Sequence, residues 1–245
     1  MQTFSSVRSQ PIVLSSSTEA QVYLLFALAM ALSVVGVFLG KLAFTLVASC
    51  VGCDATTTFA SPWSSSVLLL CVIAEFAIIL SSRWWMDSRP LNYVLFALFP
   101  LLSGFTFTPY IISILALYVN GASILLNALV STVFMSLAAA VFARTTSWNL
   151  SGMGRILFFS VLGLLIFSLL QIFVPALRGP QFEMMLSGAG VVIFAAYTAY
   201  DLQRIQAMGR VGASPFMLAL SLYLDIFNLF MFILRFMLSI SGQRR

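Results

Sequence analysis

Long apolar stretches without charge, separated by short polar segments, make up most of the chain. Each stretch is close to the ~20 apolar residues that an α-helix needs to cross a bilayer. The pattern predicts an all-α, multi-pass membrane protein with seven spanning helices. The expected spans are residues 21–46, 64–85, 91–119, 123–142, 156–174, 184–207 and 215–240.

Helix-breaking and small residues mark further features within these stretches. Residues 91–143 carry no charge and are too long for one span, so the turn dipeptide Asn120-Gly121 is expected to divide them. Pro100 and Pro109 are expected to kink the first of the two helices.

The first span carries Gly36 and Gly40 on one face. Small residues at this spacing allow helices in lipid to approach closely. The first span is therefore expected to pack tightly against a neighbouring helix.

The composition indicates a surface that faces lipid. The chain is 61% hydrophobic and 8% charged, whereas a soluble domain averages about 25% charged residues. A net charge of +5 would suggest nucleic-acid binding in a soluble protein. Here the arginines lie at the ends of apolar stretches, where they fix topology, so the expected partner is the lipid bilayer and not nucleic acid.

The positive residues predict how the chain is oriented. Cytoplasmic loops are enriched in Lys and Arg, and the internal loops on the N-terminal side hold most of them, which places the N-terminus in the cytoplasm. Residues 1–19 are expected to be a disordered cytoplasmic N-terminus, 20–241 the transmembrane domain and 242–245 a short basic tail. The N-terminal side carries Arg8, Arg83, Arg89, Arg144, Arg155, Arg204 and Arg210, and the other side Lys41, Arg178, Arg235, Arg244 and Arg245.

The chain has three cysteines and no histidine, so it lacks the commonest metal ligand. Cys50 and Cys53 form a lone CxxC that suits a redox disulfide, half a zinc site or two incidental thiols. Cys71 lies inside an apolar stretch and is expected to be packing. No cofactor is expected.

Three acidic residues, Glu75, Asp201 and Asp225, fall inside the expected spans. An ionised side chain at bilayer depth costs several kcal/mol unless it is paired or hydrated, so such residues are functional candidates by default. Glu75 is a candidate third acidic ligand or proton relay, or a glutamic acid that stays neutral.

The two aspartates are placed symmetrically about the turn between the last two spans. Both lie 12 residues from position 213, where Gly209 and Gly212 precede Ser214-Pro215. Glycine suits the end of one helix, and serine followed by proline suits the start of the next. Each aspartate is then ~18 Å along its helix from the bend, so the two carboxyls are expected at the same depth on adjacent helices.

Two carboxyls so close in a low dielectric cannot both ionise cheaply, so the pair titrates as a unit. A singly protonated pair holds its helices together, whereas a doubly ionised pair attracts a hard cation such as Ca²⁺. Asp201 and Asp225 are therefore the predicted pH sensor and the predicted ligands of a transported Ca²⁺. Thr198, Ser221 and Asn228 flank them at helical spacing and favour a hydrated face. The alternative is a structural ion pair, with Arg204 as the cation.

The sequence IFAAYTAYDLQRI, ending at Ile205, and the sequence ALSLYLDIFNLFMFILRF, from Ala219 to Phe236, resemble the paired signatures of the Bax inhibitor-1 family. A weaker resemblance to the same family covers nearly the whole chain, and the short basic tail resembles that of bacterial members more than that of animal ones. It implies a seven-helix bundle with the C-terminal helix at its centre, in the inner (plasma) membrane.

The resemblance also implies a pH-sensitive calcium leak controlled by two aspartates, which match Asp201 and Asp225 here. A cationic latch is expected from an arginine at the cytoplasmic end of the second span, where Arg83 and Arg89 are the candidates, and Arg204 is a third candidate. Some relatives regulate cell death or membrane proteolysis, so a regulator that binds a membrane protein partner is an alternative.

Two more alternatives involve the same aspartates. A proton-coupled cation exchanger would move protons in strict ratio to the cation. An intramembrane aspartyl protease would carry Gly-x-Gly before its second aspartate, whereas Leu222-Tyr223-Leu224 precede Asp225. An enzyme is therefore not expected.

Overall fold

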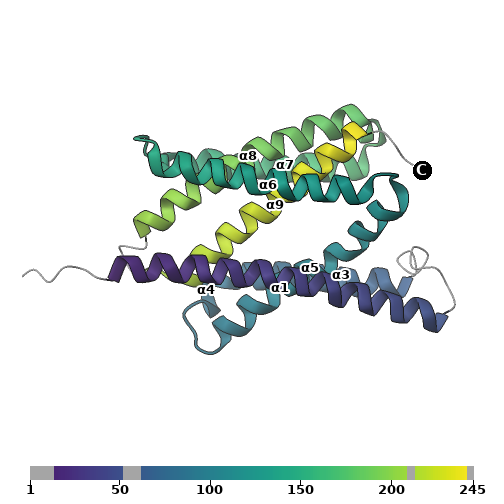
Figure 1. Ribbon diagram of the computed structural model, residues 1–245, viewed down its shortest axis with the longest axis horizontal. Coiled ribbons are helices and arrows are strands. Elements are labelled where there is room, and N and C mark those ends of the chain that lie inside the picture. Colours follow the sequence, from purple (N-terminus) through teal and green to yellow (C-terminus); the bar gives the residue numbers. More distant parts are fainter. Residues whose placement is uncertain (1–13, 52–61, 209–212, 242–245) are drawn as a thin grey trace, which may run out of the picture.

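The computed structural model describes residues 14–51, 62–208 and 213–241, and the long elements within these ranges are all helices (Figure 1). Short 3₁₀ turns connect some of them, at Leu150–Gly152 and Pro175–Arg178. The helices are α1 (Leu14–Val51), α3 (Pro62–Leu80), α4 (Ser82–Trp85), α5 (Leu91–Leu117), α6 (Gly121–Thr145), α7 (Met153–Phe173), α8 (Pro180–Met208) and α9 (Pro215–Ser241).

Six helices, α1 and α5–α9, are long and apolar enough to cross a membrane. The second expected span differs, because its described apolar helix covers only Ser64–Leu80. The separate turn α4 follows it, after a break at Ser81. The Ser81 hydroxyl donates to the Ala77 carbonyl at 2.6 Å, and such bonds from serine to its own helix bend helices.

The other helix boundaries follow the sequence closely. The expected division at Asn120-Gly121 is confirmed, since α5 ends at Leu117 and α6 begins at Gly121. A Cβ at Gly121 would press against the Ile114 carbonyl, so the tight connection needs glycine. The first helix begins at Leu14, so residues 14–19, expected to be disordered, are helical. Residues 1–13 and 242–245 lie outside the described ranges.

Helices α1 and α5 approach each other through glycine, as expected for the small-residue face of the first span. An added Cβ at Gly36 would overlap the Leu101 carbonyl, and one at Gly104 would overlap the Ser33 carbonyl. The Thr108 hydroxyl also donates to the Val37 carbonyl at 3.2 Å across this interface. The backbones of α1 and α5 are therefore in direct contact.

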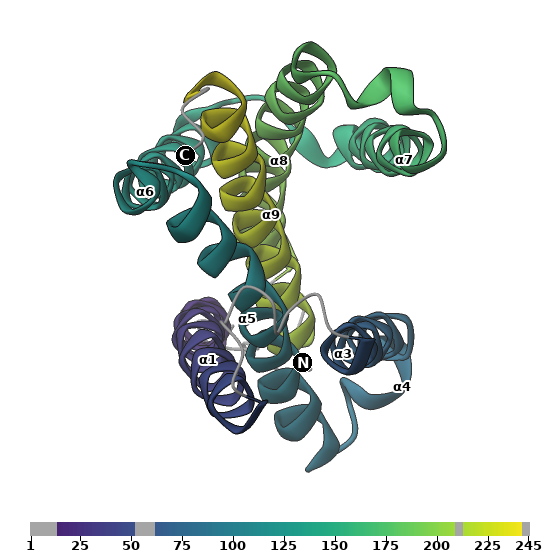
Figure 2. The same cartoon turned by 90° about the vertical axis from the view of Figure 1, so that its right-hand side faces the viewer.

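The last helix, α9, lies between two groups of helices (Figure 2). It packs against α8, α1, α6 and α5. Helices α3 and α7 lie farther out, where α3 packs on α5 and α7 packs on α8. Half of the apolar span of α9 is buried inside the protein, more than in any other candidate span.

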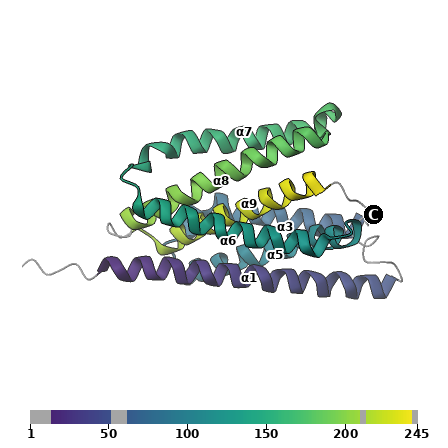
Figure 3. The same cartoon turned by 45° about the horizontal axis from the view of Figure 1, so that its top comes forward.

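The antiparallel hairpin of α8 and α9 sets the depth of the aspartates (Figure 3). Helix α8 ends at Met208, and α9 begins at Pro215, where the Leu218 amide donates to the Ser214 carbonyl at 3.3 Å. The N-terminal side is defined here as the end of the bundle where α1 begins. The end of α8 and the start of α9 lie on that side.

Candidate functional site

Asp201 on α8 and Asp225 on α9 face each other inside the bundle. Their exposed fractions are 2% and 6%, and the two carboxyls are close enough to interact directly. The symmetric spacing about the bend brings them together, as the sequence predicts.

Asp201 is the better satisfied member of the pair. The Ser221 hydroxyl on α9 donates to its Oδ2. The guanidinium of Arg204, one turn further along α8, lies 3.6 Å from its Oδ1, which is buried and, like Oδ2 of Asp225, has no hydrogen-bond partner within the described chain. The Arg204 side chain is 25% exposed, so it connects the buried carboxylate to the N-terminal side of the bundle.

Asp225 has no comparable support. Its Oδ2 is buried and has no hydrogen-bond partner within the described chain. The ion pairs found among the described residues do not include Asp225. A buried carboxylate without a cation or donor is costly, so this group favours a proton or a bound cation.

The other polar neighbours of the pair make bonds within their own helices. The Thr198 hydroxyl donates to the Phe194 carbonyl at 2.8 Å. The Asn228 amide donates to the Leu224 carbonyl at 2.7 Å. Of the flanking residues that the sequence singles out, Ser221 is the one with a hydrogen bond to an aspartate among the described residues.

Glu75 lies apart from the aspartates, between α3 and α5. Its carboxylate accepts hydrogen bonds from Thr106 at 2.9 Å and from Ser103 at 3.4 Å. The structure therefore gives Glu75 two hydroxyl donors on a neighbouring helix and does not bring it to the pair.

The arginines after α3 do not reach the pair either. Arg83 and Arg89 are exposed, and no ion pair joins them to an acidic group in the part of the chain that the structure describes. The buried Trp85 anchors this segment, since its indole donates to the Ile78 carbonyl at 3.0 Å. The cation beside the aspartates is Arg204.

A buried bond that the sequence analysis missed lies beside the pair. Tyr223, two residues before Asp225, is fully buried, and its hydroxyl lies 2.7 Å from the Ser33 hydroxyl on α1. The signal for it was a tyrosine in the middle of an apolar span. This bond ties α9 to α1 near the depth of the aspartates.

Polar cavities lie toward both ends of the bundle. The one on the N-terminal side has a volume of 520 Å³, and its lining includes Asn149, Gln203 and Arg204. The opposite one has a volume of 730 Å³, and its lining includes Tyr110, Glu183 and Arg235.

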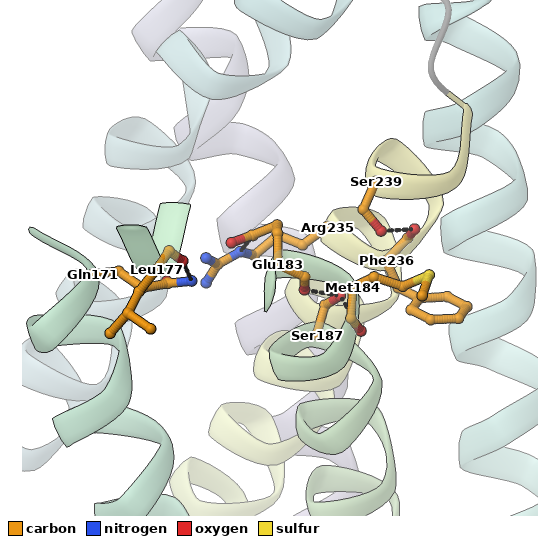
Figure 4. A network of polar contacts seen from close by, with 8 residues as sticks. All are labelled: Gln171, Leu177, Glu183, Met184, Ser187, Arg235, Phe236 and Ser239. Carbon is orange, nitrogen blue, oxygen red and sulfur yellow. Dashed lines mark hydrogen bonds and ion pairs between the residues drawn. The ribbon is translucent and has the colours of Figure 1, made fainter. Parts of the chain in front are cut away.

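The cavity opposite the N-terminal side contains an ion pair of its own, in which Arg235 Nε donates to Glu183 Oε1 at 2.8 Å (Figure 4). Arg235 was expected only as one of the positive residues on that side, and its pairing with Glu183 was not predicted from the sequence. Buried Leu229, Ile233 and Leu234 occupy α9 between Asp225 and this end.

Metal ligands are sparse in the described chain. No three His, Cys, Asp or Glu side chains come together there as a metal site. A cation at Asp201 and Asp225 would therefore depend on two carboxylates with hydroxyl and water oxygens. Cys71 is a free thiol, and Cys53 of the CxxC lies outside the described residues.

Comparison with known proteins identifies the family. The family model described as inhibitor of apoptosis-promoting Bax1 matches residues 15–243. An uncharacterized protein of Campylobacter jejuni is 30% identical over 223 residues, covering 91% of this chain and 88% of the relative.

Two named relatives agree with that match. Inner membrane protein YbhL of Escherichia coli K12 is 31% identical over 189 residues, covering 73% of this chain and 75% of the relative. Bax inhibitor 1 of Schizosaccharomyces pombe is 32% identical over 149 residues, covering 60% and 52%. The match over nearly the whole length shows that the chain is a multi-pass membrane protein of the Bax inhibitor-1 family.

Proposed function

We propose that this protein is a pH-sensitive calcium leak channel gated by Asp201 and Asp225. The observation that carries the proposal is the buried Oδ2 of Asp225, which has no hydrogen-bond partner in the described chain and lies in a carboxyl pair with one nearby guanidinium. Such a pair must take up a proton or a cation.

The charges around the pair suggest how a proton controls the gate. With one proton on the pair, a single carboxylate charge remains, and Arg204 balances it. Loss of that proton leaves one uncompensated buried charge. The two carboxylates then repel each other and attract a hard divalent cation, which prefers oxygen ligands. Deprotonation is therefore the proposed opening step, with Ca²⁺ as the cargo.

The two polar cavities are the proposed entrance and exit of the calcium path through the bundle. Arg204 lines the N-terminal cavity and contacts Asp201, so it is the proposed latch on that side, in place of Arg83 and Arg89. The apolar side chains of Leu229 and Ile233 separate the pair from the opposite cavity. The described conformation is therefore proposed to be closed, and opening requires α9 to move.

The proposal includes a topology. We place the N-terminus in the cytoplasm and α3 across the membrane as a seventh span, with α9 at the centre of the bundle. The apolar part of α3 has 17 residues, Ser64–Leu80, which is about 26 Å of helix. A hydrocarbon core of ~30 Å adapts to a mismatch of this size at modest cost.

The test is calcium flux into liposomes that contain the purified protein and a calcium dye. Native flux is expected to rise with pH, by about tenfold per pH unit below the midpoint, because one proton controls the charged form. The variant with Asp201→Asn and Asp225→Asn is expected to lose this pH dependence. Asp87→Asn, which removes an exposed aspartate, is the matched control and should behave as native.

A second candidate is a membrane regulator that binds a protein partner. The contacts of Ser221 and Arg204 with Asp201 favour it, since they tie α8 to α9 as a structural lock would. Native liposomes with no more flux than empty ones would support this candidate and contradict the channel. Flux coupled to protons in a fixed ratio would indicate an exchanger instead.

A further inference from the structure

An apolar crevice separates α1 from α6. Its volume is 840 Å³, within the range of about 300–1,000 Å³ typical of ligand pockets. One wall is on α1 and includes Met30 and Val34; the other is on α6 and includes Leu129 and Val133. Helix α9 forms the floor, and Figure 2 shows it deeper in the molecule than α1 and α6.

The crevice is long enough to hold a lipid acyl chain along its whole length. Its lining runs from Tyr23 to Phe38 on α1 and from Leu125 to Ala140 on α6. Each interval is 15 residues, or ~22 Å of helix, which exceeds the ~15 Å that half of a hydrocarbon core provides. Both helices are candidate membrane spans, so the medium that meets this crevice is lipid.

Two opposite charges lie across the end of the crevice on the N-terminal side. Arg144 follows Ala140 by one turn of α6, and Glu19 precedes Tyr23 by one turn of α1. Arg144 Nη2 lies 3.8 Å from Glu19 Oε1, and their side chains are 62% and 33% exposed. The Tyr23 hydroxyl donates to the same Glu19 oxygen at 3.3 Å.

This ion pair is long and exposed, and such pairs contribute little stability. A guanidinium has five donors and binds phosphate in a bidentate manner. A phosphate that reaches Arg144 is therefore a stronger partner than Glu19 at this distance.

We propose that the crevice binds one glycerophospholipid with a zwitterionic, amine-bearing head group. An acyl chain fills the crevice, Arg144 binds the phosphate, and Glu19 accepts from the ammonium. The two charges at the mouth match the two charges of that head group, which favours this lipid over an anionic one. The inference is independent of ion conduction.

The bound chain would contact the helix turns that carry the aspartates. Leu202, next to Asp201, and Ile226, next to Asp225, both line the crevice. The lipid would therefore pack against α8 and α9 beside the pair.

The test is native mass spectrometry of the intact protein after exchange into equimolar phosphatidylethanolamine and phosphatidylglycerol. One retained phosphatidylethanolamine per chain is expected. Ala140→Trp, which fills the crevice, should lower retention at least fivefold. Ala138→Trp is the matched control, because Ala138 is exposed on the same helix and does not line the crevice.

The head-group contact has its own pair of variants. Arg144→Gln should lower retention at least threefold, whereas Arg155→Gln, at another exposed arginine on the N-terminal side, should leave it unchanged. Equal retention in Ala140→Trp and Ala138→Trp would overturn the site. Retention of phosphatidylglycerol as strong as that of phosphatidylethanolamine, or no effect of Arg144→Gln, would overturn the head-group assignment. None of these outcomes depends on calcium flux.

Discussion

At the scale of single residues, the charge balance around the aspartates decides what the site can do. Asp201 has a hydroxyl donor and a guanidinium, whereas Asp225 Oδ2 has no hydrogen-bond partner among the described residues. The two members of the pair therefore differ in kind. Under the proposed function the pair responds to protons or cations as a unit, and Asp201 is the member that other side chains hold in place.

Replacing Arg204 is expected to change the pH profile of calcium flux. Arg204→Gln removes the positive charge near Asp201, so charging the pair becomes more costly and the flux midpoint should move to higher pH by about one unit. Arg204→Lys keeps the charge and should move it less. The measurement is liposome flux across pH.

Arg155→Gln is the control for this shift, since Arg155 is exposed at the start of α7 and outside the pair. An unchanged midpoint in Arg204→Gln would show that the charge of Arg204 does not act on the pair.

The sequence predicts the aspartate pair because the bend and the helical rise fix the depth of both residues. Ser221, one turn before Asp225, is expected on a hydrated face, but the sequence does not predict that its hydroxyl donates to Asp201 on the neighbouring helix. The sequence offers Arg204, one turn after Asp201, as a cation for the pair. It does not decide between Arg204 and the arginines after the second span, because that depends on how helices rotate in the bundle. The internal bonds of Thr198 and Asn228 escape prediction for another reason, since a polar side chain in a helix can satisfy itself locally.

At the scale of elements, the closest packing is between α1 and α5. The glycines at this interface lie against carbonyl groups of the facing helix, so no side chain fits between the backbones. Close approach through small residues stabilises helix pairs in lipid, where the hydrophobic effect does not drive association. Helices α1 and α5 are therefore expected to behave as one unit.

Substituting one of these glycines should destabilise the protein. Gly36→Ala puts a methyl group against the Leu101 carbonyl, and overpacking of this kind costs about 1–3 kcal/mol. The midpoint of thermal unfolding in detergent should fall accordingly.

Gly163→Ala in α7 is the matched control. A Cβ at Gly163 meets nothing within 4 Å, and alanine favours a helix by about 0.5–1 kcal/mol over glycine. This variant should be as stable as the native protein or more so. A Gly36→Ala protein that unfolds no earlier than Gly163→Ala would contradict the tight interface.

The helix boundaries were predictable where turn residues mark them, as at Gly121 and Pro215. The C-terminal boundary of the second span was less predictable. The apolar pattern of this span continues to Trp85, but α3 ends at Leu80, and Ser81, whose hydroxyl donates to the Ala77 carbonyl, lies at the break before α4. Which helices pack against α9 depends on which helix faces meet. Because the spans are almost uniformly hydrophobic, the sequence does not show which face of each helix is the contact face.

At the scale of the whole molecule, the membrane topology depends on α3. The loops at Ser88 and at Val119 lie at opposite ends of α5. With a cytoplasmic N-terminus, a crossing α3 places Ser88 in the cytoplasm and Val119 outside. Both residues are exposed, so a cysteine at either position is open to a labelling reagent.

Labelling of intact cells tests this topology. With Cys50, Cys53 and Cys71 replaced by serine, Val119→Cys should react with a membrane-impermeant maleimide. Ser88→Cys should react only after permeabilisation. The reverse pattern would mean that α3 does not cross or that the N-terminus faces outward, and it would contradict the proposed topology.

The short α3 also bears on the lipid around the protein. With 17 apolar residues against 27 in α5, α3 sits at the outer edge of the bundle, where it packs on α5 and meets lipid (Figure 2). As the proposed seventh span, α3 would thin the bilayer locally on that side of the protein. The free-energy cost of this mismatch would depend on the thickness of the surrounding bilayer. Because the carboxylate of Glu75 in α3 accepts hydrogen bonds from Ser103 and Thr106 of α5, a crossing α3 would transmit changes in membrane thickness to the interface between these two helices.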